Sequence, residues 1–264
     1  ESFQAERGGK EARWRLEPIR IAVQRVLDLS EAEAGVDVEV HSDIPVASGL
    51  GSSAAVAAAT ATAVSRLLGV EMALEEVFRT AYEVERFVHG TPSGIDPAIS
   101  TYGGVLLFYK DKDSTPLDVK RDIPLVVGDT GDERSTGEMV ARVRERRERY
   151  PSVVNPLIEA GGKLVLRAVE ALKEGDLDVV GELMNVNHAM LSAVGVSTES
   201  LDRLVHAARK AGALGAKLTG AGGGGCMIAL APPDGLERVV SAIEEEGGTT
   251  FVGWKTNEGV RVEG

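Results

Sequence analysis

One glycine-rich stretch constrains the fold of this chain more than any other: Asp43–Ala55, which reads DIPVASGLGSSAA. Before it, Val36–His41 alternates apolar and polar residues, as a half-buried strand does. After it, the alanine-rich sequence from Ser52 predicts a buried helix that stops at Gly69. The glycines in between allow backbone angles and close approaches that other residues resist. The stretch is therefore predicted to be a tight turn between a strand and a helix.

This turn has two interpretations. The first turn of a helix offers unpaired N–H groups and the positive end of a helix dipole, which together bind anions such as phosphate. Ser52 and Ser53 add hydroxyl groups at the same helix start. The other interpretation is purely structural, a turn closed by a serine N-cap. No lysine follows the glycines, so the stretch is not a P-loop of the GxxxxGK[ST] type.

Composition excludes several classes of function. The 264 residues, 43% of them hydrophobic, suffice for one large or two modest domains. The net charge of −12 argues against broad binding to nucleic acid or anionic membranes, because both need a basic surface. The single cysteine, Cys226, excludes an intrachain disulfide framework and suits a reducing cytoplasm. We expect neither a membrane span nor a signal peptide.

A helix predicted over Leu74–Val88 carries an acidic residue inside its apolar stripe. Glu85 lies at helical spacing from Ala81 and Val88, on the face that should turn toward a core. A carboxylate in that position is costly unless it is paired or bound to a metal. Three explanations are open: an exposed helix end, an ion pair with an arginine, or a metal ligand facing the glycine turn.

A second carboxylate lies in a turn-rich segment, His89–Ser100 (HGTPSGIDPAIS). Pro92, Gly94 and Pro97 frame Asp96 there. Such framing fixes the backbone and can aim one side chain. Asp96 is therefore either a catalytic group or an ordinary turn residue engaged in local hydrogen bonding.

The remaining elements are predicted from apolar periodicity and turn residues. The helix over 136–150 is rich in arginine with interleaved glutamate, which predicts a solvated salt-bridge face rather than a nucleic-acid patch. The charged segment Lys110–Arg121 is a candidate domain boundary. Further helices are expected over Glu17–Leu29, Asn155–Lys173, Leu177–Ala193, from Ser197 or Thr198 to Ala211, and over Leu236–Glu245; strands are expected over Gly103–Tyr109, Leu125–Asp129, Ala213–Leu218, Cys226–Ala231, Thr249–Lys255 and Val260–Val262.

A second glycine-rich turn, Thr219–Gly225 (TGAGGGG), joins two of these strands and is called the glycine loop below. A plain hairpin does not need so many glycines, so we expect a close approach of the backbone to a ligand or to another segment. An anion-binding turn with hydroxyls, an inward carboxylate and a positioned aspartate are the parts of a phosphoryl-transfer site. Backbone amides hold polyphosphate, oxygen ligands hold Mg²⁺, and a carboxylate accepts the proton of the acceptor hydroxyl.

These motifs resemble those of a known family. Pro45–Ala55 resembles the ATP-binding signature of the GHMP kinase superfamily, and Lys217–Cys226 (KLTGAGGGGC) resembles its C-terminal glycine motif. Glu85–Gly104 (ERFVHGTPSGIDPAISTYGG) and Met184–Val196 (MNVNHAMLSAVGV) closely resemble stretches of mevalonate kinases. The motifs are long and follow the family's order, from about Val36 to the end of the sequence.

The resemblance implies a two-domain α+β fold, with a ribosomal-S5-like N-terminal α/β domain over 1–120 and a ferredoxin-like C-terminal domain over 121–264. It implies phosphorylation of (R)-mevalonate at the 5-hydroxyl with ATP and Mg²⁺, in a cytoplasmic homodimer that binds neither nucleic acid nor membrane. Two alternatives stay open. One is another kinase of the superfamily, acting on phosphomevalonate, homoserine or a sugar. The other is a non-catalytic nucleotide-binding relative.

The resemblance also assigns roles to single residues. Asp96 is the implied catalytic base, and Ser53 and Glu85 are the implied Mg²⁺ ligands. The implied ATP-binding residues are Pro45, Val46, Ala47, Ser48, Gly49, Leu50, Gly51, Ser52, Ser53, Ala54 and Ala55. Substrate contacts are implied for Arg134, Thr136 and Ala221, and closure of the site for Gly220, Gly222 and Gly223.

One departure from the family pattern concerns its opening. Members begin with a segment that carries a motif like APGK…GEHAVV, with a lysine near the transferred phosphate and a histidine near the substrate. Glu1–Arg15 does not match this motif, and Lys10 is not assigned the lysine's role. We expect that the present sequence starts after that segment; the alternative is a degraded relative.

Overall fold

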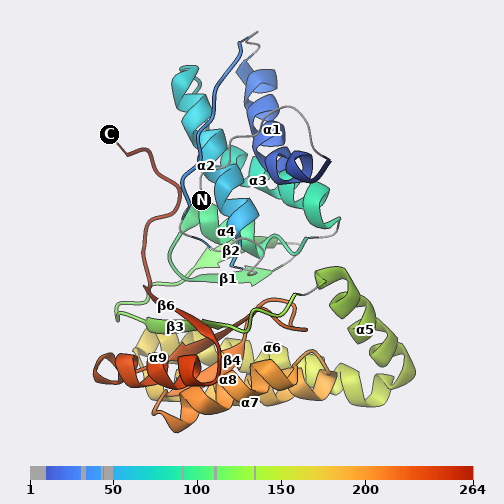
Figure 1. Ribbon diagram of the computed structural model, residues 1–264, viewed down its shortest axis with the longest axis vertical. Helices are drawn as coiled ribbons and strands as arrows, with labels where there is room; N and C mark the ends of the chain where they lie inside the picture. The colour runs from blue at the N-terminus through green and yellow to red at the C-terminus, as the bar shows by residue number, and fades with distance from the viewer. Residues whose placement is uncertain are drawn as a thin grey trace. The chain divides into compact units, whose positions relative to one another are not determined.

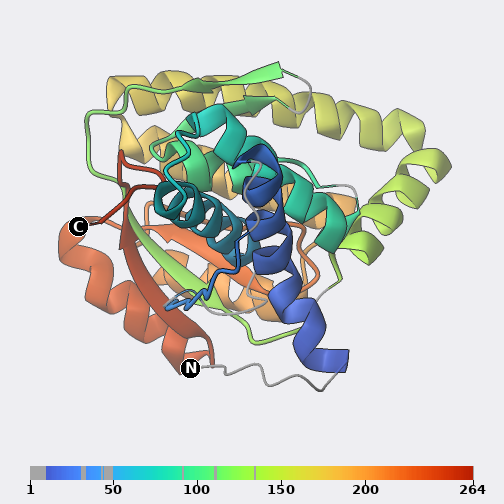
Figure 2. The same ribbon diagram turned by 90° about the horizontal axis from the view of Figure 1, so that it is seen from above.

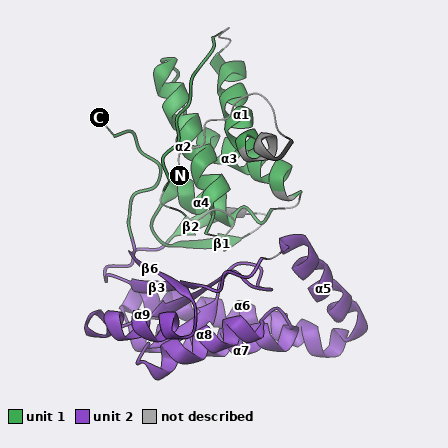
Figure 3. Cartoon of the chain, in the orientation of Figure 1, with its two compact units in different colours: residues 1–46, 50–116, 256–264 green, residues 47–49, 117–255 purple. Residues whose placement is uncertain are grey.

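Figure 1 shows the computed structural model of this chain, which describes residues 10–30, 34–42, 44, 50–90, 92–109, 112–133 and 135–263. The described residues divide into two units (Figure 3). Unit 1 holds the described residues up to Pro116 and the tail from Thr256, and unit 2 is Leu117–Lys255. The tail joins unit 1 through backbone hydrogen bonds, among them Gly104 N to Thr256 O at 2.9 Å. The predicted division of the family domains at residues 120 and 121 stays a prediction.

Helices make up most of unit 1 (Figures 1 and 2). Four alanines of one central helix, Ala54, Ala57, Ala58 and Ala61, are buried and let its neighbours approach closely. One core cluster consists of Ala22, Ala57, Ala58, Val77, Ala81 and Val84, and a second of Val26, Ala61 and Val64. The elements of this unit are α1 (Lys10–Ser30), α2 (Ser52–Leu67), α3 (Leu74–His89), α4 (Ile95–Tyr102), β1 (Leu106–Tyr109) and β2 (Lys112–Pro116). The two strands pair antiparallel.

The structure corrects the sequence prediction at several points of unit 1. Val36–His41 forms no strand: residues 34–42 pair with no described segment and are mostly exposed. An alternating pattern becomes a strand only where a neighbour exchanges hydrogen bonds with it. The first helix begins at Lys10 rather than Glu17, so Pro18 lies inside it. The segment Lys112–Pro116, expected near a domain boundary, is a strand, whereas Val260–Val262 is not.

Unit 2 places helices against an antiparallel sheet with the strand order β4-β5-β3-β6. Helices α8 and α9 cover one face of this sheet, and α7 contacts the edge strand β4 (Figure 1). The elements are β3 (Pro124–Asp129), α5 (Thr136–Arg149), α6 (Pro151–Glu174), α7 (Leu177–Val194), α8 (Glu199–Lys210), β4 (Gly215–Leu218), β5 (Cys226–Leu230), α9 (Leu236–Glu245) and β6 (Thr249–Trp254). The predicted α+β class is thereby confirmed.

The core of unit 2 is apolar and continuous between the sheet and the helices. Its fully buried large side chains include Leu201, Leu204, Leu218, Met227 and Ile243. Alternate strand residues, Ala216 and Leu218 in β4 and Met227 and Ala229 in β5, supply one side of this core. No helix within the described residues is both long and apolar enough to cross a membrane.

One close backbone approach sets the position of α7 against the sheet. A Cβ atom added to Gly215 of β4 would overlap the backbone of Gly181 in α7, and a Cβ added to Gly181 would lie 2.5 Å from the carbonyl carbon of Leu214. Neither glycine leaves room for a side chain. The helix can therefore lie against the strand only because both positions are glycine.

We expect the substitution Gly215→Ala to lower the free energy of unfolding by about 2–3 kcal/mol, because the added methyl group must push α7 away from β4. Gly253→Ala is the matched control, since Gly253 lies in β6 of the same sheet and an added Cβ there meets nothing within 4 Å. Urea unfolding followed by circular dichroism measures both. Equal midpoints for the two variants would contradict the close approach.

Candidate active site

Helix α2 begins after Gly51, whose left-handed backbone favours glycine over other residues. Gly51 is the N-cap, with φ 74° and ψ 22°, and no described side chain caps the helix there. The structural interpretation of the turn as a serine N-cap is therefore wrong, because Ser52 and Ser53 are the first helical residues. The N–H groups of the first turn are left without a side-chain cap, which is the arrangement that anion binding at a helix start requires.

A buried carboxylate lies beside this helix start. Glu85 of α3 is 3% exposed, and one of its oxygens accepts a hydrogen bond from the Ser53 hydroxyl. The explanation of Glu85 by an exposed helix end is thus wrong. The sequence prediction that Glu85 turns inward is confirmed, and the structure brings it into contact with the residue that was predicted as its companion ligand.

Asp96 lies against the same helix start. It is in the first turn of α4, after the N-cap Gly94 with φ 92°, rather than in the irregular turn that the prolines and glycines predict. A Cβ atom placed on Gly51 would lie 3.2 Å from the Cβ of Asp96 and 3.5 Å from its Oδ1. Gly51 is therefore packed directly on Asp96. Within unit 1 the structure brings together Gly51, Ser53, Glu85 and Asp96.

The glycine loop of unit 2 follows β4, and its backbone is held by neighbouring segments. Gly222 and Gly223 have φ of 76° and 78°. The N–H of Gly223 donates to the carbonyl oxygen of Val196 at 2.8 Å. A Cβ on Gly222 would overlap that same carbonyl group, and a Cβ on Gly223 would lie 2.6 Å from the sulfur of Met139. The expected close approach is thus present, at least to Val196 and Met139.

The sequence interpretation did not identify these neighbours of the glycine loop. Asp132 is another, because its carbonyl oxygen accepts from Gly225 N at 3.3 Å. Thr130 also anchors the loop, since its hydroxyl donates to Gly225 O at 2.9 Å. One signal pointed to Val196: it ends the stretch Met184–Val196 that was singled out from the sequence.

The other predicted site residues fall into three groups. Pro45, Val46, Ala47, Ser48, Gly49 and Arg134 lie outside the described residues. Ala54 is fully buried in unit 1, so its side chain belongs to the core, whereas Leu50 and Ala55 are half-buried. In unit 2, the exposed Thr136 opens α5, and the half-buried Ala221 lies in the glycine loop between Gly220 and Gly222.

The donor atoms fit a magnesium–nucleotide complex better than a metal held by protein alone. No group of three or more His, Cys, Asp or Glu side chains among the described residues could hold a metal. Ser53 and Glu85 supply two oxygen donors in direct contact. Mg²⁺ prefers oxygen ligands and is usually bound through one or two carboxylates together with substrate phosphates and water. The pair matches that pattern.

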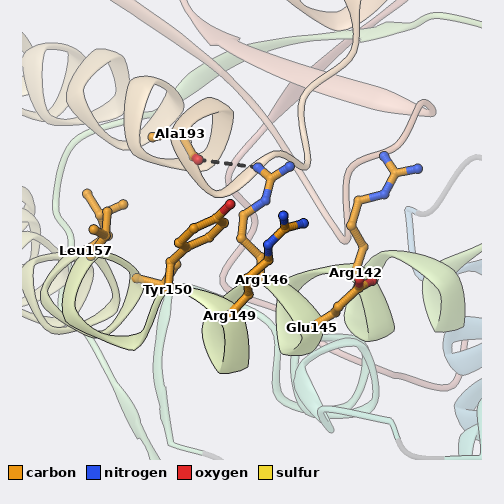
Figure 4. A pocket seen from close by; sticks show the side chains of 9 residues that line it. Arg142, Glu145, Arg146, Arg149, Tyr150, Leu157 and Ala193 are labelled. Carbon is orange, nitrogen blue, oxygen red and sulfur yellow. Dashed lines mark hydrogen bonds between the residues drawn. The ribbon is translucent and has the colours of Figure 1, made fainter.

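A hollow of about 470 Å³ lies elsewhere in unit 2, between α5, α6 and the end of α7 (Figure 4). None of the predicted site residues lines it. Arg146 in its wall donates to the carbonyl oxygen of Ala193 at 3.5 Å and packs against Gly195, which ends α7. A cation at the C-terminal end of a helix is favourable. Most arginines of α5 are exposed, as predicted for a solvated face, and the half-buried Arg146 reaches the end of α7.

Comparison with known proteins agrees with this arrangement. The model of the GHMP kinases N terminal domain matches residues 18–104, and that of the GHMP kinases C terminal domain matches residues 168–249. The fold is therefore that of a GHMP kinase, and the predicted superfamily is confirmed.

Closer relatives narrow this class. The mevalonate kinase of Pyrococcus horikoshii is 50% identical over 251 residues, which cover 93% of this chain and 74% of the relative. The crystal structure of L. major mevalonate kinase in complex with R-mevalonate superposes with a TM-score of 0.80 and 31% identity, covering 96% of this chain and 80% of that one. The crystal structure of the Methanococcus jannaschii mevalonate kinase superposes with a TM-score of 0.79 and 29% identity, covering 91% of this chain and 75% of that one. The chain belongs to the mevalonate kinase family.

We expect Gly222→Ala to lower the free energy of unfolding by about 2–4 kcal/mol, because the new side chain both overlaps Val196 and needs a left-handed backbone. Gly247→Ala is the control: its φ is 86°, but an added Cβ meets nothing within 4 Å. That variant should lose only the conformational part, about 1–2 kcal/mol. Urea unfolding compares the two, and equal losses would mean that the loop does not depend on its contact with Val196.

Proposed function

We propose that this chain transfers the γ-phosphoryl group of ATP to the 5-hydroxyl of (R)-mevalonate, giving 5-phosphomevalonate for isoprenoid biosynthesis. The observation that carries the proposal is the packing of Asp96 against Gly51, at the start of a helix whose first turn holds the Ser53–Glu85 pair. Membership of the mevalonate kinase family supports the choice of acceptor.

The proposed chemistry follows from the position of each group. The N–H groups at the start of α2 hold phosphate oxygens, and the helix dipole favours their negative charge. Ser53 and Glu85 would hold Mg²⁺, which offsets charge on the phosphate oxygens when bound. The Asp96 carboxylate accepts the proton of the 5-hydroxyl while that oxygen forms its bond to the γ-phosphorus. The bond from the γ-phosphorus to the bridging oxygen breaks, and ADP leaves.

The remaining residue roles are proposals as well. The carboxylate of mevalonate suits the guanidinium group of Arg134, and Thr136, two residues later, is proposed as a second contact. Ala221 is placed near the substrate, and Gly220, Gly222 and Gly223 close the site. The Pro45–Ala55 stretch supplies the ATP contacts.

We also propose that two copies of the chain associate in the cytoplasm. Ile158, Val165 and Leu166 support the association, because they recur at helical spacing on α6 and are 49%, 44% and 51% exposed. Apolar side chains gathered on one helix face favour a partner over water. The lone Cys226, which is buried, suits a reducing compartment.

An assay for ADP release tests the function directly. With Mg·ATP, (R)-mevalonate should be turned over, and phosphomevalonate, homoserine and galactose should not. Asp96→Asn should reduce kcat by about a hundredfold or more while ATP binding stays nearly unchanged, because only the proton acceptor is lost. Asp178→Asn is the control, since Asp178 is an exposed carboxylate in the first turn of α7. Turnover of another acceptor, or undiminished turnover in Asp96→Asn, would contradict the proposal.

A second variant tests the metal role of Glu85. Glu85→Gln keeps the size of the side chain and its capacity to accept from Ser53 but removes the charge, so the Mg²⁺ concentration for half-maximal turnover should rise about tenfold. Glu83→Gln on the same helix is the control, because Glu83 is an exposed partner of Arg25 at 3.6 Å. An unchanged Mg²⁺ requirement in Glu85→Gln would return Glu85 to a purely structural role.

A further inference from the structure

Strand β4 is an edge strand, and its outward backbone groups need partners. In the sheet order β4-β5-β3-β6, β5 is its only strand partner among the described residues. The N–H groups of Ala216 and Leu218 point away from β5 and would be unpaired at an open edge. Leu218 matters most, because the glycine loop begins at the next residue.

Side chains of α7 close this edge in place of another strand. Asn185 accepts from Ala216 N through its Oδ1 at 3.0 Å and donates through its Nδ2 to Leu214 O at 3.4 Å. One turn later, His188 accepts from Leu218 N through its Nδ1 at 3.3 Å. Both residues belong to the stretch Met184–Val196, whose sequence was distinctive but which the proposed phosphoryl transfer does not use.

The outward carbonyl groups of β4 are satisfied as well. Arg209 of α8 donates through its Nη2 to Ala216 O at 2.6 Å. Lys217 donates through its Nζ to Leu218 O at 2.7 Å. Burial lowers the pKa of this lysine to about 8. Side chains therefore pair with both outward N–H groups, of Ala216 and Leu218, and with the carbonyl oxygens of Leu214, Ala216 and Leu218.

The hydrogen bonds of His188 assign one protonation state. Since Nδ1 accepts the Leu218 N–H, the hydrogen of the neutral ring is on Nε2, where it donates to Asp202 Oδ1 at 3.0 Å. The Ser197 hydroxyl donates to the same oxygen at 2.5 Å. His188 is 6% exposed, and the tautomer of its ring is fixed by hydrogen bonds at both nitrogens.

We propose that His188 is a positioning residue that, in its neutral form, holds the end of β4 and thereby the glycine loop in place. Where it concerns turnover, this role rests on the proposed function. The second attachment of the loop supports it: the carbonyl of Val196, just after α7, accepts from Gly223 N. Helix α7 thus holds the strand that enters the loop, and Val196, two residues after the helix ends, holds the middle of the loop.

Protonation of His188 should release this hold. A charged ring carries hydrogen on Nδ1 and cannot accept from Leu218 N. Burial lowers the pKa of His188 below its ordinary value of 6.5, Arg209 and Lys217 lower it further, and Asp202 opposes them. As the pH falls, His188 takes up its proton in the unfolded chain before it does so in the folded one. The stabilisation of the folded state by neutral His188 is therefore complete above the ordinary pKa and is lost as the pH falls toward the lower pKa of the folded state.

Two substitutions separate the two ring nitrogens. In His188→Asn the amide oxygen takes the place of Nδ1, so the acceptor for Leu218 is kept and the donor to Asp202 is lost. In His188→Gln the amide nitrogen takes the place of Nε2, so the donor is kept and the acceptor is lost. His206→Gln is the control, because His206 is exposed on α8. The measurements are hydrogen exchange of the amides over 214–225 and kcat/KM for ATP, each across pH.

We expect His188→Gln to lose about tenfold or more in protection of the Leu218 and loop amides and in kcat/KM for ATP, because a buried N–H is left unpaired. His188→Asn and His206→Gln should stay within about threefold of the natural chain on the same scale. Below about pH 6.5 the natural chain should lose protection, and His188→Asn should not, since Asp202, Arg209 and Lys217 are unchanged in it.

Three outcomes distinguish hydrogen bonding by His188 from mere space filling, and the positioning role from the proposed function. Equal losses in His188→Asn and His188→Gln would overturn the proposal, because His188 would then act only by filling space. Natural protection of Leu218 in His188→Gln would overturn it too. If the exchange pattern is as expected but the natural chain phosphorylates no mevalonate, the proposed function fails and the positioning of the loop by His188 stands.

Discussion

The buried carboxylate of Glu85 is the constraint on which the first half of the site depends. An ionised group removed from water must be balanced by hydrogen-bond donors or a cation, and failure to do so costs several kcal/mol. The Ser53 hydroxyl that faces Glu85 comes from the first turn of α2. Satisfying Glu85 therefore fixes α3 against the end of α2 that is suited to phosphate. The same contact places a carboxylate where a cation bound with that phosphate would neutralise it, so that a structural need and a chemical role coincide.

Three glycines also position the site, because the absence of a side chain lets another segment pack closely against each of them. Gly51 lets Asp96 pack on the start of α2, Gly222 lets the glycine loop pass under Val196, and Gly215 lets β4 approach α7. A methyl group at Gly222 or Gly215 would collide with its neighbour, and one at Gly51 would lie 3.2 Å from the Cβ of Asp96, closer than ordinary contact. The left-handed backbone at Gly51 and Gly222 adds a second requirement, because L side chains resist it. These glycines are therefore fixed by packing inside their own units, whatever a bound ligand adds.

The sequence predicted those parts of the fold and of the site that depend on contacts between residues close together in the chain. The apolar stripe of α3 predicted both the helix and the inward position of Glu85, because both follow from helical spacing. The strand predicted at Val36–His41 failed, since pairing depends on residues remote in the sequence. Asp96 was expected in an irregular turn because Pro97 and Gly94 are turn residues, yet proline also suits the first turn of a helix. The role of His188 was missed because its partner Leu218 lies 30 positions away.

The glycine loop shows why single hydrogen bonds matter here. Five of the six residues at 220–225 are glycine, and each costs roughly 0.5–1 kcal/mol more to order than alanine would, so the total is about 3–5 kcal/mol. A hydrogen bond returns about 1 kcal/mol. The hydrogen bonds made by Thr130, Asp132, Val196 and His188 together contribute about as much free energy as ordering the glycines costs. Losing one of them, with its partner left buried and unpaired, is then enough to loosen a loop whose backbone would otherwise sample many conformations.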